Sequence, residues 1–280
     1  MTPPTPNKTQ TWQIHHTDKL HYQATRGAPS LRIKFYHYPT YRQTVHTTNP
    51  PKNCTLKTKG LNTYYLYTAQ VPTKGTITFE RTITITPHPT PPPTDYGHIS
   101  AIPTDLARKY RQSHPYWPLD SKPLKHLTDE RWFSTDSLQD WLLTIATLIP
   151  TIIHTAEPQD KRWGAEKVLQ SGIGDCDEFT DLFITLARLR GIPSRRLTGY
   201  HINTTTLTPV PHAWAECYTT TAGWIPIDLA LHNIGAHTSD YLIQKIEEFN
   251  PDLPDFQIQQ QSSYLHVNWE RPPPTLTPLS

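Results

Sequence analysis

A cysteine at position 176 stands where a chain can present a nucleophile. The apolar residues after it recur with helical spacing as far as Leu189, and Gly191 and Pro193 then end the pattern. The spacing predicts a buried helix that begins at Cys176. Unpaired N–H groups and the positive end of the helix dipole lie at such a start, and both favour the nucleophilic thiolate. A lone cysteine is more commonly a small buried apolar residue, so the assignment depends on a histidine elsewhere in the chain.

Two strand-like segments further along the chain supply a histidine and an aspartate. In the first segment, a period of two places His212, Trp214 and Glu216 on one face. The second segment ends at Asp228, and a short turn between the two would pair them antiparallel. His212 and Asp228 then meet at one end of the hairpin. A charged strand residue beside a site, such as Glu216, is more commonly a hydrogen-bonding neighbour than an acid catalyst.

Together these residues make a Cys-His-Asp triad. The imidazole of His212 would take the thiol proton of Cys176, while Asp228 fixes the imidazole tautomer and supports the imidazolium. His201 and His232 flank the two segments and are the alternatives to His212. We favour His212 because the residue pattern around it is tighter than theirs.

Three blocks of the sequence resemble the transglutaminase-like superfamily of papain-like cysteine enzymes: Gly174–Cys176 with Leu189–Pro193 downstream, His212–Glu216, and Gly223–Asp228. Their order and their neighbours match the family, and the resemblance covers residues 160–280 best. It implies Cys176 as the nucleophile, His212 as the base and Asp228 as the orienting acid. It also implies the microbial type of the family, which carries a β-rich N-terminal region. Thr180 departs from the pattern, since the family usually has a small alanine there.

Trp214 and Glu216, beside His212, are candidates for supporting roles, and Trp163 and Asp175 are two more. Some relatives use a tryptophan upstream of the cysteine as an oxyanion donor, so the resemblance makes Trp163 a candidate through its indole N–H. Packing is the alternative for Trp163, given the large apolar surface of the side chain. Asp175 stands just before the predicted helix, where an aspartate commonly caps the first turn. Cys217 is predicted to be a buried core residue rather than a second reactive thiol.

The predicted fold class is α+β. A papain-like transglutaminase core, with the nucleophile helix packed on an antiparallel sheet, follows a small β-sandwich-like domain. Leu31, Ile33 and Phe35 alternate with charged residues in the N-terminal part, a half-buried strand pattern, and a scaffold role is favoured there over substrate recognition. Residues 241–249 have the spacing of an amphipathic helix. The predicted divisions are a flexible arm at 1–10, a β-rich domain at 11–87, a proline-rich linker at 88–98, the catalytic domain at 99–270 and a flexible tail at 271–280.

The composition points away from nucleic acid, membranes and metals as partners. Lys and Arg number 26 against 24 Asp and Glu, so the formal net charge of +2 indicates neither a nucleic acid nor a membrane surface. The 15 histidines lack metal-ligand spacing, and neither a metal nor a cofactor is expected. No signal peptide and no run of about 18 apolar residues is recognised. Cys54, Cys176 and Cys217 suit reduced thiols better than disulfides, which predicts a cytoplasmic setting.

The predicted activity is acyl transfer from a peptide or carboxamide bond of a protein or peptide substrate, through a thioester. If water accepts the acyl group, the enzyme is a protease or amidase; if an amine accepts it, the enzyme is a transglutaminase. The hydrolase is favoured because relatives of the microbial type resemble proteases, and because no acidic cluster suggests the calcium regulation of animal cross-linking enzymes. Two other classes stay open: a binding module that kept the fold without the activity, and an interaction protein whose β-rich N-terminal half carries the function.

Overall fold

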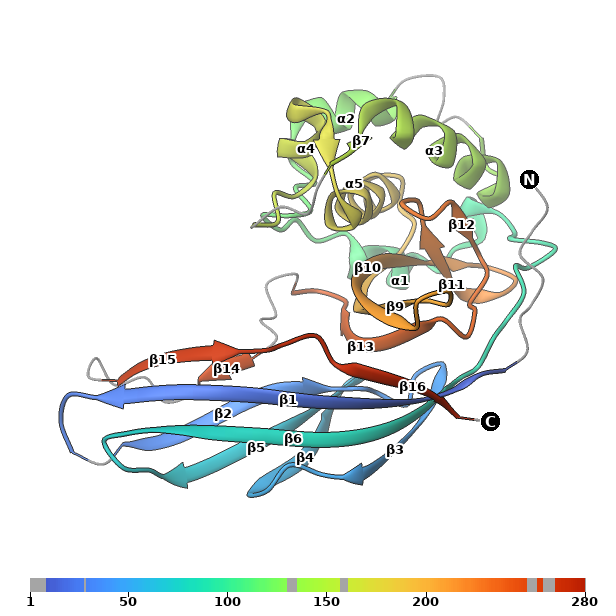
Figure 1. Cartoon of the computed structure of the whole chain (residues 1–280). Coiled ribbons are helices and arrows are strands. Elements are labelled where there is room, and N and C mark those ends of the chain that lie inside the picture. Colours follow the sequence, from blue (N-terminus) through green and yellow to red (C-terminus); the bar gives the residue numbers. More distant parts are fainter. Residues whose placement is uncertain are drawn as a thin grey trace.

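The chain folds into a layer of helices, a central antiparallel sheet and a β-sandwich (Figure 1). The computed structural model describes residues 9–27, 29–129, 135–156, 161–250, 256–258 and 265–279. Residues 1–8 of the predicted N-terminal arm lie outside the described residues. The combination of separate helices and antiparallel sheets confirms the α+β prediction.

The sandwich is built mostly from the N-terminal part of the chain, as the alternating apolar pattern predicts. Its first six strands are β1 (Thr11–Ala24), β2 (Ser30–His37), β3 (Gln43–Asn49), β4 (Cys54–Lys59), β5 (Asn62–Gln70) and β6 (Lys74–Pro87). Along β1, buried side chains alternate with half-buried ones because one face packs on the second sheet. Tyr22, Phe35 and Phe79 belong to the core that the two sheets share.

The C-terminal segment completes this sandwich. Strand β6 pairs with one edge of β1, while β15 (Leu265–Glu270) and β16 (Thr275–Leu279) pair antiparallel with the other edge. The short strand β14 (Phe256–Ile258) extends the second sheet beside β2. The predicted flexible tail at 271–280 is therefore wrong for the residues of β16. The edge of β1 presents unpaired backbone donors and acceptors, which β16 satisfies while Leu276 packs against the core.

The other half of the molecule is a five-stranded antiparallel sheet with helices on one face. The strand order is β12–β11–β10–β9–β13. Its elements are η1 (Ile99–Ala101), α1 (Thr104–Tyr110), α2 (Lys122–Asp129), α3 (Leu138–Ile152), β7 (His154–Thr155), α4 (Ala165–Ser171), β8 (Ile173–Gly174), α5 (Cys176–Leu189), β9 (Ser194–Asn203), β10 (Thr208–Thr219), β11 (Gly223–Asp228), β12 (Asn233–Ile234) and β13 (Tyr241–Glu247). Across the described residues, no helix has both the length and the apolar character that crossing a membrane requires.

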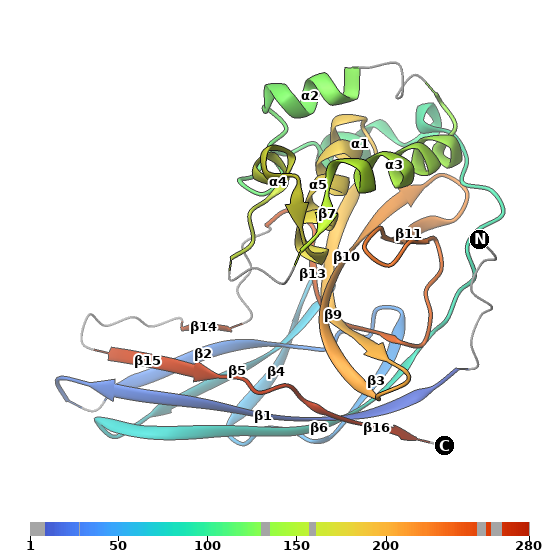
Figure 2. The ribbon, with the colours of Figure 1, turned by 45° about the horizontal axis from the view of Figure 1, so that its top comes forward.

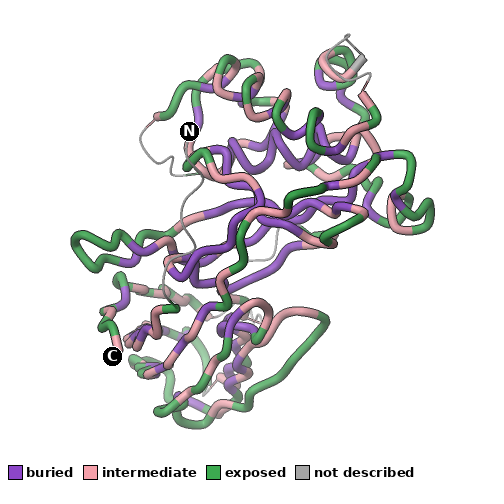
Figure 3. The backbone as a smooth tube through the Cα atoms, turned by 90° about the vertical axis from the view of Figure 1, so that its right-hand side faces the viewer, coloured by how far each residue is buried: buried purple, intermediate pink, exposed green. Residues whose placement is uncertain are grey.

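Helix α5 is the centre of this half. It begins at Cys176, as predicted, because Asp175 caps its first turn by accepting the Asp177 N–H at 2.8 Å, and Glu178 completes a capping box. The sheet lies on one side of α5, and α2, α3 and α4 lie on the other (Figures 1 and 2). Residues 178–188 are consequently buried without interruption (Figure 3).

Strand β13 lies between the two halves of the molecule. The prediction of an amphipathic helix over 241–249 is wrong, since Tyr241–Glu247 form a strand that pairs with β9. All seven residues are buried because β2, β5 and β6 of the sandwich cover the side that the catalytic half leaves open. Two charged residues of the strand are buried as well. Lys245 and Glu247 form an ion pair, with 2.9 Å between Nζ and Oε1.

Two side-chain amides of the sandwich complete the outer edge of β13. Gln43 donates from Nε2 to the Ile243 carbonyl at 2.7 Å and accepts the Ile243 N–H on Oε1 at 3.0 Å. Asn62 donates to the Ile246 carbonyl at 2.7 Å and accepts its N–H at 2.8 Å. Each amide takes the place of a residue in a neighbouring strand. Directional hydrogen bonds therefore join the two halves.

The predicted linker is an extended segment docked on the catalytic half. Thr90 and His237 exchange backbone hydrogen bonds of 2.8 and 2.9 Å. Nearby, the indole N–H of Trp12 in β1 donates to the Ser239 carbonyl at 2.7 Å. The segment before β13 is thus fixed by both the linker and the sandwich.

Replacing Gln43 by alanine should lower the free energy of unfolding by roughly 1–3 kcal/mol, because the buried N–H and C=O of Ile243 would lose their partners. Urea unfolding followed by circular dichroism measures this difference. Gln23→Ala is the matched control, since Gln23 is exposed on β1 and its replacement should change stability by no more than about 0.5 kcal/mol. Equal effects of the two substitutions would contradict the role given to Gln43.

Candidate active site

His212 and Asp228 meet in the hairpin formed by β10 and β11. The register pairs Ala215 with Ile227, which brings His212 diagonally opposite Asp228. Nε2 of His212 lies 2.6 Å from Oδ2 of Asp228. The two side chains are 8% and 1% exposed, so the pair is shielded from water. The structure thus brings together two of the three residues that the sequence selects as a triad.

Further contacts fix the orientation of this pair. The backbone N–H of Leu231 donates to Oδ1 of Asp228 at 3.1 Å, and the hydroxyl of Tyr241 donates to Oδ2 at 2.8 Å. Trp214 stacks on the imidazole of His212, with ring centroids 6.0 Å apart and planes inclined by 18°. Both oxygens of the Asp228 carboxylate therefore accept hydrogen bonds, and the indole of Trp214 packs against one face of the imidazole.

The backbone of Ala213 connects the start of α5 to this pair. It hydrogen-bonds to the sulfur of Cys176, and its carbonyl accepts the hydroxyl of Thr180 at 3.2 Å. Ala213 follows His212 in the chain, so both bonds place the cysteine end of α5 beside β10 at the level of the histidine. Thr180, which replaces the usual alanine of the family, thus binds the helix to the strand.

The environment of Cys176 favours the thiol over the thiolate. Burial raises the pKa of Cys176 to about 12, and the carboxylate of Asp177 adds to the rise. The hydrogen bond from Ala213 and the charge of Arg196 act in the opposite direction but do not overcome burial. The expectation that the helix start alone would favour a thiolate is therefore wrong for the free site. The sulfur needs a base to take its proton.

Arg196 ties Asp177 into a buried network of charges. It is paired with Asp177 and also with Glu247, the latter at 2.9 Å between Nη1 and Oε2. Arg162 lies near the same Glu247 and is paired with Asp181 on α5. This network compensates the charge of the carboxylate beside the nucleophile.

Glu178 ties the loop before α5 to the helix. Its two oxygens accept the backbone N–H groups of Trp163 at 2.8 Å and of Asp175 at 3.2 Å. Burial raises the pKa of Glu178 to about 7, and Asp175 adds to the rise. Trp163 is half-buried, with the ammonium of Lys167 over its ring at 4.2 Å from the centroid. The structure thus places Trp163 next to the start of α5, and an oxyanion role for its indole stays a prediction.

Trp214 and Glu216, both selected as neighbours of the site, lie in different surroundings. Trp214 stacks on His212. Glu216 lies four residues after His212 along β10, which is roughly 13 Å at the rise of a strand. The carboxylate of Glu216 is buried and accepts hydrogen bonds from Tyr41, Arg42 and Arg195. Glu216 therefore joins the sandwich to the sheet rather than contacting His212.

The alternative residues have other partners. Nε2 of His201 is paired with Asp240 at 3.0 Å, and its ring centroid lies 5.8 Å from that of His212. His232 is exposed in the turn after β11, with a left-handed φ of 54°. Cys217 is fully buried in the core under α5. Of the three histidines, His212 is the one hydrogen-bonded to Asp228.

Sequence reasoning missed Tyr241 and Glu178. Tyr241 was hidden because its segment has the spacing of a helix, and nothing local marks it as a partner of Asp228. Glu178 had a usable signal, since an acid three residues after Asp175 is the capping-box pattern.

One group of possible metal ligands occurs among the described residues. Asp175, Cys176 and Asp177 present ligand atoms within 4.8 Å of one another. The carboxylate of Asp175 already caps α5, and that of Asp177 is paired with Arg196. Because both acids have protein partners, the group does not fit a metal site.

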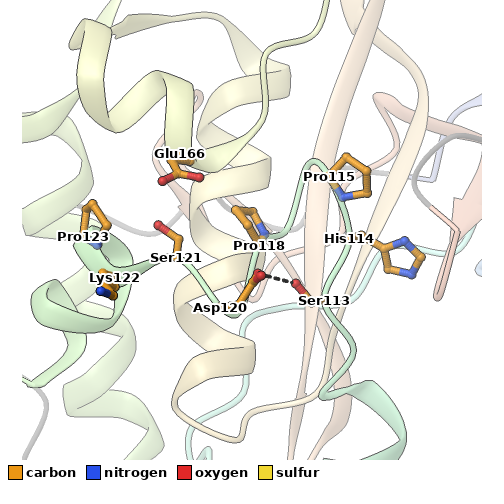
Figure 4. Close-up of a pocket in the computed structure, with 9 residues that line it drawn as sticks. All are labelled: Ser113, His114, Pro115, Pro118, Asp120, Ser121, Lys122, Pro123 and Glu166. Atoms are coloured by element: carbon orange, nitrogen blue, oxygen red, sulfur yellow. Dashed lines mark hydrogen bonds between the residues drawn. The ribbon is translucent and has the colours of Figure 1, made fainter.

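A pocket of about 750 Å³ lies apart from these residues (Figure 4). It is formed by the loop before α2 and by Glu166 of α4, and its lining includes a hydrogen bond of 2.8 Å from Ser113 to Asp120. Cys176, His212 and Asp228 are not among its lining residues. The pocket is therefore separate from the candidate active site.

The region of the site matches a known family. Residues 128–229 match the model of the Transglutaminase-like superfamily, and this stretch contains Cys176, His212 and Asp228. The resemblance found in the sequence is confirmed: this part of the chain is a transglutaminase-like core.

Two further comparisons show which proteins the chain is similar to. An uncharacterised protein of Haemophilus influenzae is 26% identical over 127 residues, which are 38% of this chain and 32% of the relative. The match thus spans about a third of that relative's length. A solved structure of a candidate cysteine protease from Cytophaga hutchinsonii is 16% identical, with a TM-score of 0.62, over 98% of this chain and 99% of its own. Its likeness extends to the β-rich N-terminal region, so the two chains share an overall fold.

The prediction of a cytoplasmic setting is wrong in its premise, and the solved structures that resemble the chain include a periplasmic domain. The periplasmic domain of TgpA from Pseudomonas aeruginosa is 15% identical, with a TM-score of 0.40, over 83% of this chain and 93% of its own. The prediction rested on three cysteines, which are all free. They lie on β4, α5 and β10, three separate elements. Free thiols of this kind do not identify a compartment.

Glu178→Gln should remove one source of pH-dependent stability. Glu178 has a pKa of about 7 in the folded chain against about 4.3 in an unfolded one, so the folded state binds the proton more tightly. The contribution of Glu178 to stability therefore falls as pH rises from about 4.5 to 7 and is level above that. The free energy of unfolding of the wild type minus that of Glu178→Gln should decrease across this window, as measured by urea unfolding at stepped pH. A constant difference would contradict the assignment. Glu80→Gln, an exposed position on β6, is the control.

Proposed function

We propose that the protein is a cysteine-dependent acyl-transfer enzyme that hydrolyses peptide or carboxamide bonds in a protein or peptide substrate. The proposal is carried by the 2.6 Å contact between His212 Nε2 and Asp228 Oδ2, one residue from the Ala213 backbone that binds Cys176. A nucleophile at a helix start, a base on a strand and a carboxylate behind the base are the parts of such a site. The transglutaminase-like core around them supports the same function.

The first half of the reaction forms a thioester. Asp228 holds the Nε2–H of His212, which leaves Nδ1 to receive the thiol proton of Cys176. The thiolate attacks the carbonyl carbon, and the oxyanion accepts a hydrogen bond from the Cys176 N–H, with the indole of Trp163 as a second candidate donor. When the C–N bond breaks, His212 gives its proton to the leaving amine. The acyl group stays on the sulfur.

The second half returns the enzyme to its starting state. His212 takes a proton from water, and the resulting hydroxide attacks the thioester carbonyl. The C–S bond breaks, the acid product leaves, and Cys176 regains the proton. An amine in place of water would form a new amide, which is the transglutaminase alternative. The same side chains serve both acceptors.

Iodoacetamide should alkylate Cys176 near neutral pH, and His212→Ala should slow this alkylation by on the order of 10²–10⁴-fold. Burial and Asp177 raise the pKa of Cys176 to about 12, so loss of its proton depends on the base. Peptide mass spectrometry after timed quenching gives the rate for each cysteine separately. Cys54 is an internal control, because burial also raises its pKa to about 12 and it lies in the sandwich. It should react slowly in both proteins.

His232→Ala is the matched histidine control, since His232 is exposed and should leave the rate unchanged. Equal rates at Cys176 and Cys54 in the wild type, or no effect of His212→Ala, would count against the enzyme and favour a binding module on the same fold.

A pool of glutamine-containing peptides, incubated with and without a primary amine, should identify the acyl acceptor. We expect shorter peptides or deamidated glutamine, because water is the proposed acceptor, and Cys176→Ala should abolish either product. Mass spectrometry separates these products from peptides that have gained the amine. Amine incorporation alone would replace the hydrolase with a transglutaminase.

A further inference from the structure

The Asp228 oxygen that contacts His212 also accepts a second hydrogen bond. The hydroxyl of Tyr241 donates to Oδ2 at 2.8 Å, and Nε2 of His212 lies 2.6 Å from the same atom. The backbone N–H of Leu231 occupies Oδ1. Tyr241 is 3% exposed, so its hydroxyl is removed from water. Solvent therefore does not compete for this contact with the carboxylate.

Tyr241 reaches Asp228 from a strand that is not its neighbour. Tyr241 begins β13 and Asp228 ends β11, with β9 and β10 between them in the strand order. The tyrosine ring packs against the rings of His201 and Trp214, with centroids 4.9 and 5.1 Å away. Gly199 on β9 allows β13 to approach, because a Cβ there would lie 1.9 Å from the Leu242 carbonyl oxygen. These contacts direct the hydroxyl at the carboxylate.

We propose that Tyr241 is a positioning residue that sets how strongly Asp228 holds the imidazolium of His212, an inference that rests on the proposed function. A hydroxyl that donates to Oδ2 takes up part of the negative charge that would otherwise act on Nε2. Together with the Leu231 N–H, it also prevents rotation of the carboxylate. Tyr241 thus keeps the imidazole aligned while limiting the stability of the imidazolium, so that the proton can pass on to the leaving amine.

The groups around His212 give the hydroxyl a constant role across pH. The titratable groups near the imidazole are Asp228 on β11, His201 on β9 with its partner Asp240, Cys176 and Asp177 on α5, and Tyr241 on β13 with His237 at 6.2 Å from its ring. Burial, and then Asp228, raise the pKa of Tyr241 far above its usual value. The hydroxyl therefore keeps its proton and remains a donor throughout the range in which an imidazole titrates.

The test is an NMR titration of the His212 imidazole in Cys176→Ala protein, where no thiol shares the proton. Its signal is assigned by its loss in His212→Gln. Tyr241→Phe should raise the titration midpoint of His212 by roughly 0.5–1 pH unit, because Asp228 then holds the imidazolium more strongly. A fluorinated tyrosine at position 241, whose hydroxyl is a stronger donor, should lower the midpoint. A purely structural role would not produce opposite shifts from two nearly isosteric side chains.

Tyr38→Phe is the matched control, because Tyr38 is also buried and the substitution removes a hydroxyl contact of 2.9 Å to His16. This substitution should leave the titration midpoint of His212 unchanged. A midpoint that stays the same in both Tyr241 variants overturns the proposal. If Tyr241→Phe does not fold, the fluorinated variant alone decides. The titration requires no turnover, so it tests the role of Tyr241 separately from the proposed function. If the proposed function is wrong, alkylation of Cys176 will not depend on His212.

Discussion

The buried carboxylate of Asp228 is the point at which the strands of the site are fixed to one another. It is bonded to His212 on β10, to Tyr241 on β13 and to the backbone of Leu231 after β11. A buried carboxylate is unfavourable unless its capacity for hydrogen bonds is met. The fold must therefore deliver each donor to it. The hairpin register and the placement of β13 have to be correct together, because an error in either would leave this charge without its partners.

The sandwich takes part in this arrangement through β13 and through Glu216. Gln43 and Asn62 bond the outer edge of β13, and Arg42 approaches the buried Glu216 from the same side. Removing one member of a buried ion pair leaves the other charge uncompensated, which costs more stability than the intact pair contributes. These contacts support a scaffold role for the N-terminal half. They also argue that the half which carries the site would not keep its geometry without it.

The parts of the structure that could be predicted from the sequence are those set by near neighbours. Asp175, the apolar spacing after Cys176 and the β10–β11 hairpin are local signals, and they located the helix start and the His212–Asp228 contact. The surroundings of β13 and β16 depend on partners far away in the chain. Leu276 is partly buried because it pairs with Ile14 on β1, and no local pattern encodes that partner. Tyr241 was missed for the same reason: its role exists only once β13 is placed against β9.

The raised pKa of Cys176 shows what this long-range assembly achieves. Burial outweighs the helix start, so the free site stores a thiol and not a thiolate. Reactivity then depends on a base that is itself fixed by Asp228, and Asp228 depends on contacts delivered by β11 and β13. Loss of any of these contacts would leave an inert buried thiol rather than an unguarded nucleophile. In the proposed mechanism, the folded chain keeps the sulfur as a thiol until the base that β10, β11 and β13 position takes its proton.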